Sequence, residues 1–189
     1  MKLIKIAVVL LPMLMGVSAR AGLLLEPYLS YESSNQDAKF LGADASGKST
    51  GVQLGARVGY TLPVLFWLAL DYSLINDGTF KPDSGSSEKV SRSDLYLDAG
   101  FDFPILVRAW FGYGIGNKAT LKSSLGDSDL EGGSSYKLGV GFTALPIVSI
   151  NLEYFSNDFE KVDGTKLSDI ASSFKDTGFR LGVSAPFDL

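Results

Sequence analysis

Eight stretches of this chain alternate strictly between apolar residues and polar or small ones. In the stretch 66–75, every second residue is Phe, Leu or Tyr, and the residues between them include Asp71 and Ser73. A period of two places successive side chains on opposite faces of a β-strand. The pattern therefore predicts eight strands, at about residues 24–32, 51–62, 66–75, 93–103, 107–115, 136–144, 148–154 and 178–187.

The strands belong to a unit that repeats about every 41 residues. Four tyrosines lie at that fixed interval: Tyr31, Tyr72, Tyr113 and Tyr154. Four prolines keep nearly the same spacing: Pro63, Pro104, Pro146 and Pro186. A four-bladed propeller has a similar repeat length, but each blade needs four short strands. These units instead contain two long strands and a polar connection, which favours four strand–turn–strand pairs.

The connections between the predicted strands alternate in length. Three are tight turns, at residues 62–65, 103–106 and 145–148. Four are long and rich in Ser, Gly, Asp, Asn and Lys, at residues 33–50, 76–92, 117–134 and 156–176. Short periplasmic turns and long extracellular loops are typical of outer-membrane barrels. We therefore expect four extracellular loops and both chain ends in the periplasm.

The first 21 residues have the features of a secretory signal peptide. Lys2 and Lys5 precede a short apolar run, Ile6–Met15, and Ser18–Ala21 offers an A-x-A cleavage site before Gly22. The run is too short to cross a membrane, so a retained anchor is the weaker alternative. The sequence predicts a signal peptide over residues 1–21 and one domain over residues 22–189.

These features together predict an all-β fold, an eight-stranded antiparallel up-and-down transmembrane β-barrel. Runs of about 9–11 residues have the length that a tilted strand needs to cross a bilayer. The apolar face would contact lipid, and closure would remove edges that lipid cannot hydrogen-bond. A narrow barrel leaves little interior volume, which explains the many glycines on the polar face. The predicted location is the outer membrane of a Gram-negative bacterium.

Composition excludes several classes of function. The formal net charge is −4, and removal of the basic signal peptide makes the remainder more acidic, which argues against nucleic-acid binding. The chain has no His and no Cys. Serine–histidine catalysis, cysteine nucleophiles, His-based zinc sites and disulfides are therefore excluded. A mechanism that uses only carboxylates stays open, but no catalytic, cofactor-binding or metal-binding residue is predicted.

Two short motifs resemble binding sites without the context that such sites need. Gly42–Ser49 matches the P-loop pattern, yet a P-loop must be followed by a helix whose N-terminus binds phosphate, and here a predicted strand follows. Asp127–Glu131 contains three carboxylates but lacks the spacing of a calcium-binding EF-hand loop. We interpret the first motif as a surface loop and the second as solvated loop charge.

A third group of charged residues lies on the predicted inward face of the strands. Its members are Arg57, Asp71, Asp98, Lys137, Glu153 and Arg180. Unpaired charge in a narrow interior is costly, so we expect these side chains to form ion pairs and hydrogen bonds. They could form a structural plug or line a narrow ion path. Sequence does not determine which residues pair, because the stagger of the strands shifts the neighbours.

With these features the chain, over residues 22–189, resembles the small eight-stranded outer-membrane barrels of the OmpA transmembrane domain and OmpX group. The last strand carries part of the resemblance, through the alternation of Phe179, Leu181, Val183, Ala185, Phe187 and Leu189. The resemblance implies that the barrel-assembly machinery reads this strand. Members of the group usually end in Phe, whereas this chain ends in Leu189. Outer-membrane barrel enzymes use a histidine, and this chain has none.

The predicted function is a non-enzymatic structural or adhesin-like role, in which four extracellular loops contact a surface ligand. The alternative is a narrow channel, or transport of small or apolar molecules across the outer membrane. The expected partners are outer-membrane lipid, lipopolysaccharide and the barrel-assembly machinery, with no nucleic acid. The chain is expected to be a monomer.

Overall fold

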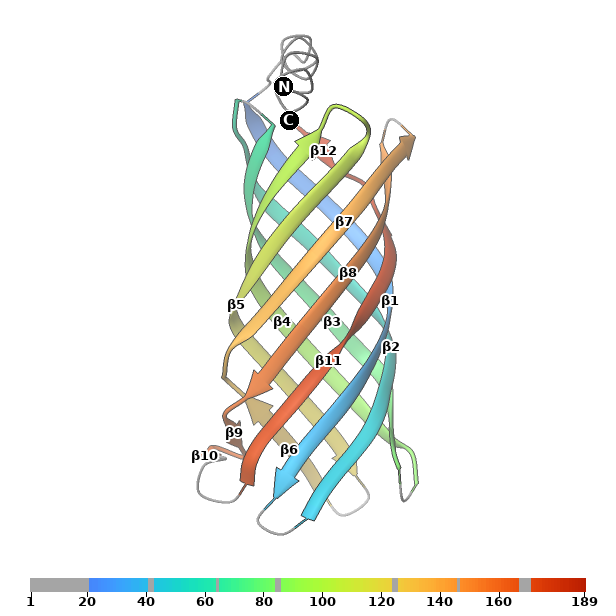
Figure 1. Cartoon of the computed structure of the whole chain (residues 1–189), viewed down its shortest axis with the longest axis vertical. Helices are drawn as coiled ribbons and strands as arrows, with labels where there is room; N and C mark the ends of the chain where they lie inside the picture. Colours follow the sequence, from blue (N-terminus) through green and yellow to red (C-terminus); the bar gives the residue numbers. More distant parts are fainter. Residues whose placement is uncertain are drawn as a thin grey trace, which may run out of the picture.

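The computed structural model describes residues 21–40, 43–63, 65–83, 86–123, 126–145, 147–166 and 171–189. Residues 1–20 of the predicted signal peptide lie outside these ranges. Eight long strands build the molecule (Figure 1): β1 (Gly22–Phe40), β2 (Ala43–Thr61), β3 (Phe66–Pro82), β4 (Glu88–Phe103), β5 (Val107–Ser123), β7 (Ser135–Leu145), β8 (Val148–Phe159) and β11 (Ala171–Ser184). Four short strands complete the sheet: β6 (Gly126–Glu131), β9 (Lys161–Val162), β10 (Thr165–Lys166) and β12 (Phe187–Asp188).

The eight long strands form a closed antiparallel barrel. Each long strand pairs with the next along the chain, β5 pairs with β7, and β11 pairs with β1 to close the ring. Closure satisfies the backbone groups of every long strand within the wall, as a strand-built membrane protein requires. This confirms the predicted eight-stranded up-and-down barrel. In the described ranges, no helix is long and apolar enough to cross a membrane.

The apolar side chains point outward and the polar ones inward. In β3, Leu70 and Tyr72 are about half exposed, at 51% and 50%, whereas Asp71 between them is fully buried. This is the reverse of a soluble protein, and it places an apolar surface where lipid can cover it. Three of the regularly spaced tyrosines, Tyr31, Tyr72 and Tyr113, are likewise exposed on the outer face.

The two ends of the barrel differ, and we name them by their connections. The turn end, uppermost in Figure 1, carries the short turns and the C-terminus. In the turns after β2 and β4, Leu65 and Leu106 adopt positive φ angles of 69° and 64°. At this end Leu189 also exchanges two backbone hydrogen bonds with Leu23. The hairpin end, lowest in Figure 1, carries the long connections.

The strands extend much farther into the hairpin end than predicted. Strands of 9–11 residues were expected, but β1 and β2 each span 19 residues and β3 spans 17. Most of the segments predicted as loops, such as 33–50, are therefore β-hairpin. The prediction was wrong because it ended each strand where the outward residues stop being apolar. Beyond the lipid, alternation continues with polar residues on the outer face, as with Asn35 and Asp37.

The hairpin end has a small apolar core of its own. Strand β6 pairs with β5 on one side and with β9 on the other, and β10 pairs with β9. These pairings join the third and fourth long connections into one sheet. Beneath it, Ala119, Leu130 and Phe159 are buried together, and Val162 and Phe174 pack against them. We call these five residues the hairpin-end cluster.

Candidate functional site: the charged lumen

The barrel interior contains a dense set of buried charges. Among the described residues, five basic and seven acidic side chains are buried there. They are Glu26, Glu32, Arg57, Asp71, Arg92, Asp94, Asp98, Arg108, Lys137, Glu153, Asp176 and Arg180. Each lies on the inward face because the strand period of two places it there. We call this set the lumen network.

Arg57 lies at the centre of the network. Four carboxylates surround its guanidinium group: Asp71 at 3.0 Å, Glu26 at 3.1 Å, Asp98 at 3.2 Å and Glu153 at 3.3 Å. These acids come from four different strands, so one side chain holds opposite walls of the barrel together. A guanidinium group suits this position because its planar array of donors can serve several carboxylates at once.

Lys137 shares three of these four carboxylates. It is fully buried and forms ion pairs with Asp71, with Asp98 at 3.0 Å and with Glu153 at 3.5 Å. Gly112 faces the lumen beside it, and a Cβ atom there would overlap Asp98 and Lys137. The missing side chain of Gly112 therefore provides the room that the ammonium group and its partners occupy.

Aromatic side chains stack against the central basic groups. The Arg57 guanidinium lies 4.5 Å from the Trp110 ring centroid, and the Lys137 ammonium lies 4.7 Å from that of Tyr96. The Tyr28 hydroxyl donates a 2.7 Å hydrogen bond to Asp71. Cation–π contacts of this kind strengthen when they are shielded from water. They also fill the space between the ion pairs.

A second group of charges lies toward the hairpin end. Arg92 contacts Asp94 at 3.0 Å, Asp176 at 2.7 Å, and Glu32. Arg180 contacts Glu32 at 2.8 Å and Asp94 at 3.0 Å. The two guanidinium groups thus share two carboxylates, which balances the repulsion between them.

Toward the turn end, the lumen contains a cluster of buried apolar side chains. Leu24, Trp67, Ala69 and Trp110 are buried together, and the two indole rings lie 6.5 Å apart. The Trp110 ring lies against Gly139, where a Cβ atom would overlap it. With the hairpin-end cluster at the opposite end, a buried apolar cluster lies toward each end of the lumen.

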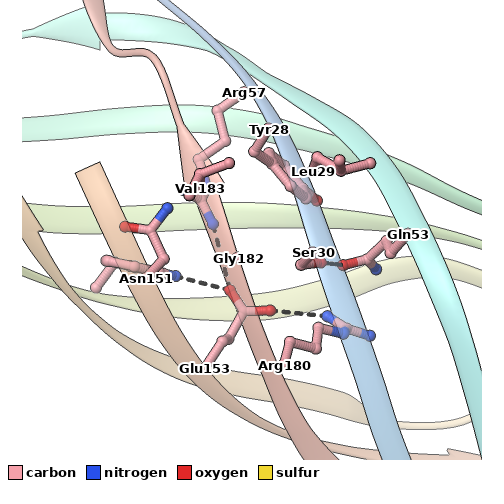
Figure 2. A pocket seen from close by; sticks show the side chains of 11 residues that line it. Tyr28, Leu29, Ser30, Gln53, Arg57, Asn151, Glu153, Arg180, Gly182 and Val183 are labelled. Atoms are coloured by element: carbon pink, nitrogen blue, oxygen red, sulfur yellow. Dashed lines mark hydrogen bonds and ion pairs between the residues drawn. The ribbon is translucent and has the colours of Figure 1, made fainter. Parts of the chain in front are cut away.

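One small cavity lies beside the network in the part of the lumen that the structure describes. A cavity of about 20 Å³ is lined by residues that include Ser30, Gln53, Arg57, Glu153 and Arg180 (Figure 2). That volume holds about one water molecule. In Figure 2, Arg57 and Arg180 converge on the Glu153 carboxylate, and Ser30 donates to Gln53 at 2.8 Å. This arrangement can fix charges in place, and a cavity of this size is too small for a substrate larger than water.

The structure brings all six sequence-predicted lumen residues into one contiguous cluster. Arg57 and Lys137 share the carboxylates of Asp71, Asp98 and Glu153, and Arg180 joins through Glu153. Six further members of the network were not singled out from sequence: Glu26, Glu32, Arg92, Asp94, Arg108 and Asp176. The alternation along the predicted strands already places three of them on the inward face: Glu26, Asp94 and Arg108. Arg92 and Asp176 lie in segments predicted as loops, and the period-two pattern extended into these segments places both on the inward face.

The two other motifs form strands, not the loops that were expected. Gly42 lies outside the described residues, and residues 43–49 belong to β2, so no helix follows the P-loop-like segment. The acidic segment Asp127–Glu131 lies in β6. There Asp129 and Glu131 contact the Lys118 ammonium at 2.8 Å and 2.9 Å. Their charge is thus partly balanced within the hairpin-end sheet.

A closed eight-stranded barrel with an apolar outer wall and a charged interior is an architecture of outer-membrane proteins. The family model of the outer membrane protein beta-barrel domain matches residues 6–187. The chain belongs to this family. Membership implies the outer membrane of a Gram-negative bacterium as its location. A comparison with curated proteins gave no match.

Solved structures of small outer-membrane barrels share the fold. Neisserial surface protein A is 20% identical, with a TM-score of 0.53, and the match covers 85% of this chain and 97% of that one. Ail, the attachment invasion locus protein of Yersinia pestis, is 17% identical, with a TM-score of 0.51 and coverage of 86% and 99%. Outer membrane protein AlkL is 11% identical, with a TM-score of 0.52 and coverage of 92% and 94%. At these identities the likeness concerns the fold alone.

Proposed function

We propose that this family member is a non-enzymatic protein that acts at the cell surface through the β-structure of its hairpin end. One observation carries the proposal: the hairpin end is an ordered sheet with its own apolar core. Strand β1 continues from Tyr31, on the outer face, to Phe40, and β6 and β9 join two connections into one surface. A preformed surface loses less conformational entropy on binding than flexible loops would.

The orientation follows the general asymmetry of outer-membrane barrels. Short turns and chain ends face the periplasm in such proteins, and long connections face outward. The hairpin end of this chain would then be extracellular. Its described strands carry both acidic and basic side chains on the outer face, such as Asp37 and Lys175, which are paired across β1 and β11. Such a surface suits a polar or charged ligand better than an apolar one.

The dense ion pairs of the lumen support a structural role for the lumen network. Ion pairs cross the barrel, a buried apolar cluster lies toward each end, and the described cavity holds about one water. An ion would have to break several buried pairs to pass, and a buried charge left without its partner is costly. This argues against an open channel as the main function.

The fold neighbours are consistent with a surface role without establishing one. Ail carries attachment and invasion in its name, and it has been crystallised with the heparin analogue sucrose octasulfate. The protein from Neisseria is named as a surface protein. These two names support the proposal that this chain also acts at the cell surface.

The proposal is tested by removing Glu160–Lys166, the segment that carries β9 and β10, and measuring attachment of bacteria that display the protein. Immobilised sulfated and neutral glycans and extracellular matrix are the surfaces to offer. We expect attachment to fall while heat-dependent gel mobility shows a folded barrel. The control is Ile105→Ser, at the exposed turn end, which should attach normally. Unchanged attachment after all four hairpins are shortened would contradict the proposal.

A second measurement separates the surface role from transport. The refolded protein in a planar bilayer is expected to be silent. Discrete openings whose size or frequency changes in Arg57→Ala and Asp98→Ala would instead make the lumen network a gate and favour the channel function.

A further inference from the structure

A groove of about 610 Å³ crosses the apolar outer wall of the barrel. Its floor is a row of three directly opposed residues: Gly100 on β4, Trp110 on β5 and Gly139 on β7. The residues before and after each of them along the strand point outward and form the two walls. The groove therefore runs across the strands, between two rows of outward side chains. Its volume falls within the range of small-molecule sites, about 300–1,000 Å³.

The groove has room because one small residue lies on each wall. Ala99 is on one wall and Ala109 on the other, each opposite a phenylalanine of the neighbouring strand. Two of the residues that line the groove carry a polar side-chain group. The Trp110 indole donates its hydrogen bond to Glu153 inside the lumen, so the remaining polar group is the Tyr154 hydroxyl. An occupant of the groove must therefore be apolar over nearly its whole length.

An aromatic pair lies at each end of the groove. Phe66 packs edge-on against Phe101 with 4.8 Å between the ring centroids, and Tyr154 packs against Phe179 with 5.4 Å. Phe66 is the first residue of β3, next to the turn end, whereas Tyr154 lies farther toward the hairpin end. Because the strands tilt (Figure 1), a groove that crosses them also passes obliquely through the membrane. Its ends are five strand spacings apart, about 24 Å along the wall. This shape fits one extended hydrocarbon chain.

The surroundings of the groove indicate which chain fills it. An unfilled groove would leave its walls without dispersion contacts, and lipid is the material around it. Tyrosine hydroxyls prefer the boundary between lipid and water, so the Tyr154 end marks the polar end of the occupant. The hairpin end of such barrels faces outward, and lipopolysaccharide forms the outer leaflet of the outer membrane.

We propose that this groove binds one acyl chain of lipopolysaccharide, with the sugar-bearing end of the chain near Tyr154. The occupant is held by its hydrocarbon, because the lining offers a single polar group to the rest of the molecule. The groove lies in the membrane wall and shares with the surface role only the orientation of the barrel. Loss of one function would therefore leave the other in place.

The two tryptophans of the chain report on this groove. Trp110 lies in its floor, and the Trp67 ring lies against Gly100, where a Cβ atom would overlap it. Brominated acyl chains quench indole fluorescence at short range, so the refolded barrel is placed in vesicles of brominated phosphatidylcholine. Ala109→Phe, which fills the groove, should be quenched less than the unchanged barrel. The control Ala56→Phe adds the same ring to β2, outside the groove, and should be quenched like the unchanged barrel.

Lipopolysaccharide without bromine is then added to the vesicles. The quenching that Ala109→Phe lacks should fall by half when lipopolysaccharide is about one-tenth of the lipid, a preference of about tenfold or about 1.4 kcal/mol. A fall that only follows the dilution of the brominated lipid would show that any acyl chain fits, which overturns the proposal. Equal quenching of Ala109→Phe and the unchanged barrel would overturn it as well, because no chain would then occupy the groove. Quenching that rises as the barrel is diluted in lipid would assign the groove to a second barrel instead.

A second variant covers the case in which heat-dependent gel mobility shows that Ala109→Phe does not fold. Ala99→Leu narrows the groove from the opposite wall. Barrels extracted from outer membranes in mild detergent are weighed by native mass spectrometry. The unchanged barrel and Ala56→Phe should retain a lipopolysaccharide molecule, and Ala99→Leu should lose it. Equal retention by Ala99→Leu, or none by the unchanged barrel, would contradict the proposal.

Discussion

Arg180 donates a 2.8 Å hydrogen bond to Glu153, and this contact joins the two halves of the lumen network. On the hairpin side Arg180 shares carboxylates with Arg92, and on the turn side Glu153 contacts Arg57 and accepts from the Trp110 indole at 2.9 Å. The chain separation of Arg180 and Glu153 is 27 residues, and their strands are neighbours in the barrel. Charges along much of the lumen are therefore coupled.

The coupling between these two residues can be measured with a double-mutant cycle. Arg180→Met alone should lower the free energy of unfolding by about 3–5 kcal/mol, because it leaves buried carboxylates without a partner. The double variant, Arg180→Met with Glu153→Gln, should lose less stability than the two single variants lose together. We expect a coupling energy of about 0.5–3 kcal/mol. Urea unfolding of the refolded barrel is the measurement. The exposed pair Lys89–Asp77, at 3.3 Å, is the matched control and should show almost no coupling.

Lys137 should be indispensable for stability despite being a buried charge. Lys137→Met leaves Asp71, Asp98 and Glu153 with less positive charge in a fully buried position. We expect a loss of about 3–5 kcal/mol in the free energy of unfolding. Adding Asp98→Asn should recover part of it. Lys175→Met, at an exposed position, should have little effect. A Lys137→Met barrel as stable as the original would show that the ion pairs contribute nothing.

The turn-end apolar cluster depends on Gly139. Its Cα faces the Trp110 ring, and Gly139→Ala would insert a methyl group into that ring. Overpacking of this kind costs about 1–3 kcal/mol. The urea midpoint should fall and the tryptophan emission should change. Gly116→Ala is the control, because the nearest atom to its Cβ would be 3.8 Å away. Equal midpoints for the two variants would refute the role of Gly139.

The hairpin-end cluster should be separable from the barrel. Phe159→Ala removes the largest buried ring of the cluster, and such changes in a packed core cost about 3–5 kcal/mol. We expect faster trypsin cleavage after Lys161 and Lys166, with heat-dependent gel mobility of the barrel unchanged. Thr165→Ala, at an exposed position of β10, should leave cleavage as it is. Unaltered cleavage in Phe159→Ala would mean that the cluster does not order this end.

The acidic strand β6 should be sensitive to low pH. Hydrogen bonds from Lys118 and Thr120 lower the pKa of Asp129 below its ordinary value of 3.8. A carboxyl group whose pKa is lower in the folded state stabilises the fold at pH values above its unfolded pKa. That stabilisation is lost as the pH falls through its folded pKa. The contact between Asp129 and Lys118 should therefore hold at neutral pH and weaken below about pH 4. An NMR titration of the Asp129 carboxyl should show the lowered pKa, and Lys118→Met should raise it toward 3.8.

Much of the membrane part of the fold could be predicted from local pattern. The period of two in segments such as 66–75 assigned an outward face to Leu70 and an inward face to Asp71, as the structure shows. Burial in lipid requires an uninterrupted apolar face, so the signal is strong there. Beyond the lipid, the outer face contacts water, so it no longer needs to be apolar. For this reason the apolar pattern does not predict the strand extensions, which include Gln36 and Asp176.

By itself, the sequence determined the strand number, the closed barrel and which side chains face inward, because alternation and repeat length are local properties of a chain beside lipid. Only the tertiary structure decided which charges meet. Arg57 and Glu153 are 96 residues apart in sequence, and their contact depends on barrel closure and on the stagger between strands. The same closure brings Gln36 opposite Asp176. Long-range pairings of this kind arise from the register of the whole sheet, which no single segment encodes.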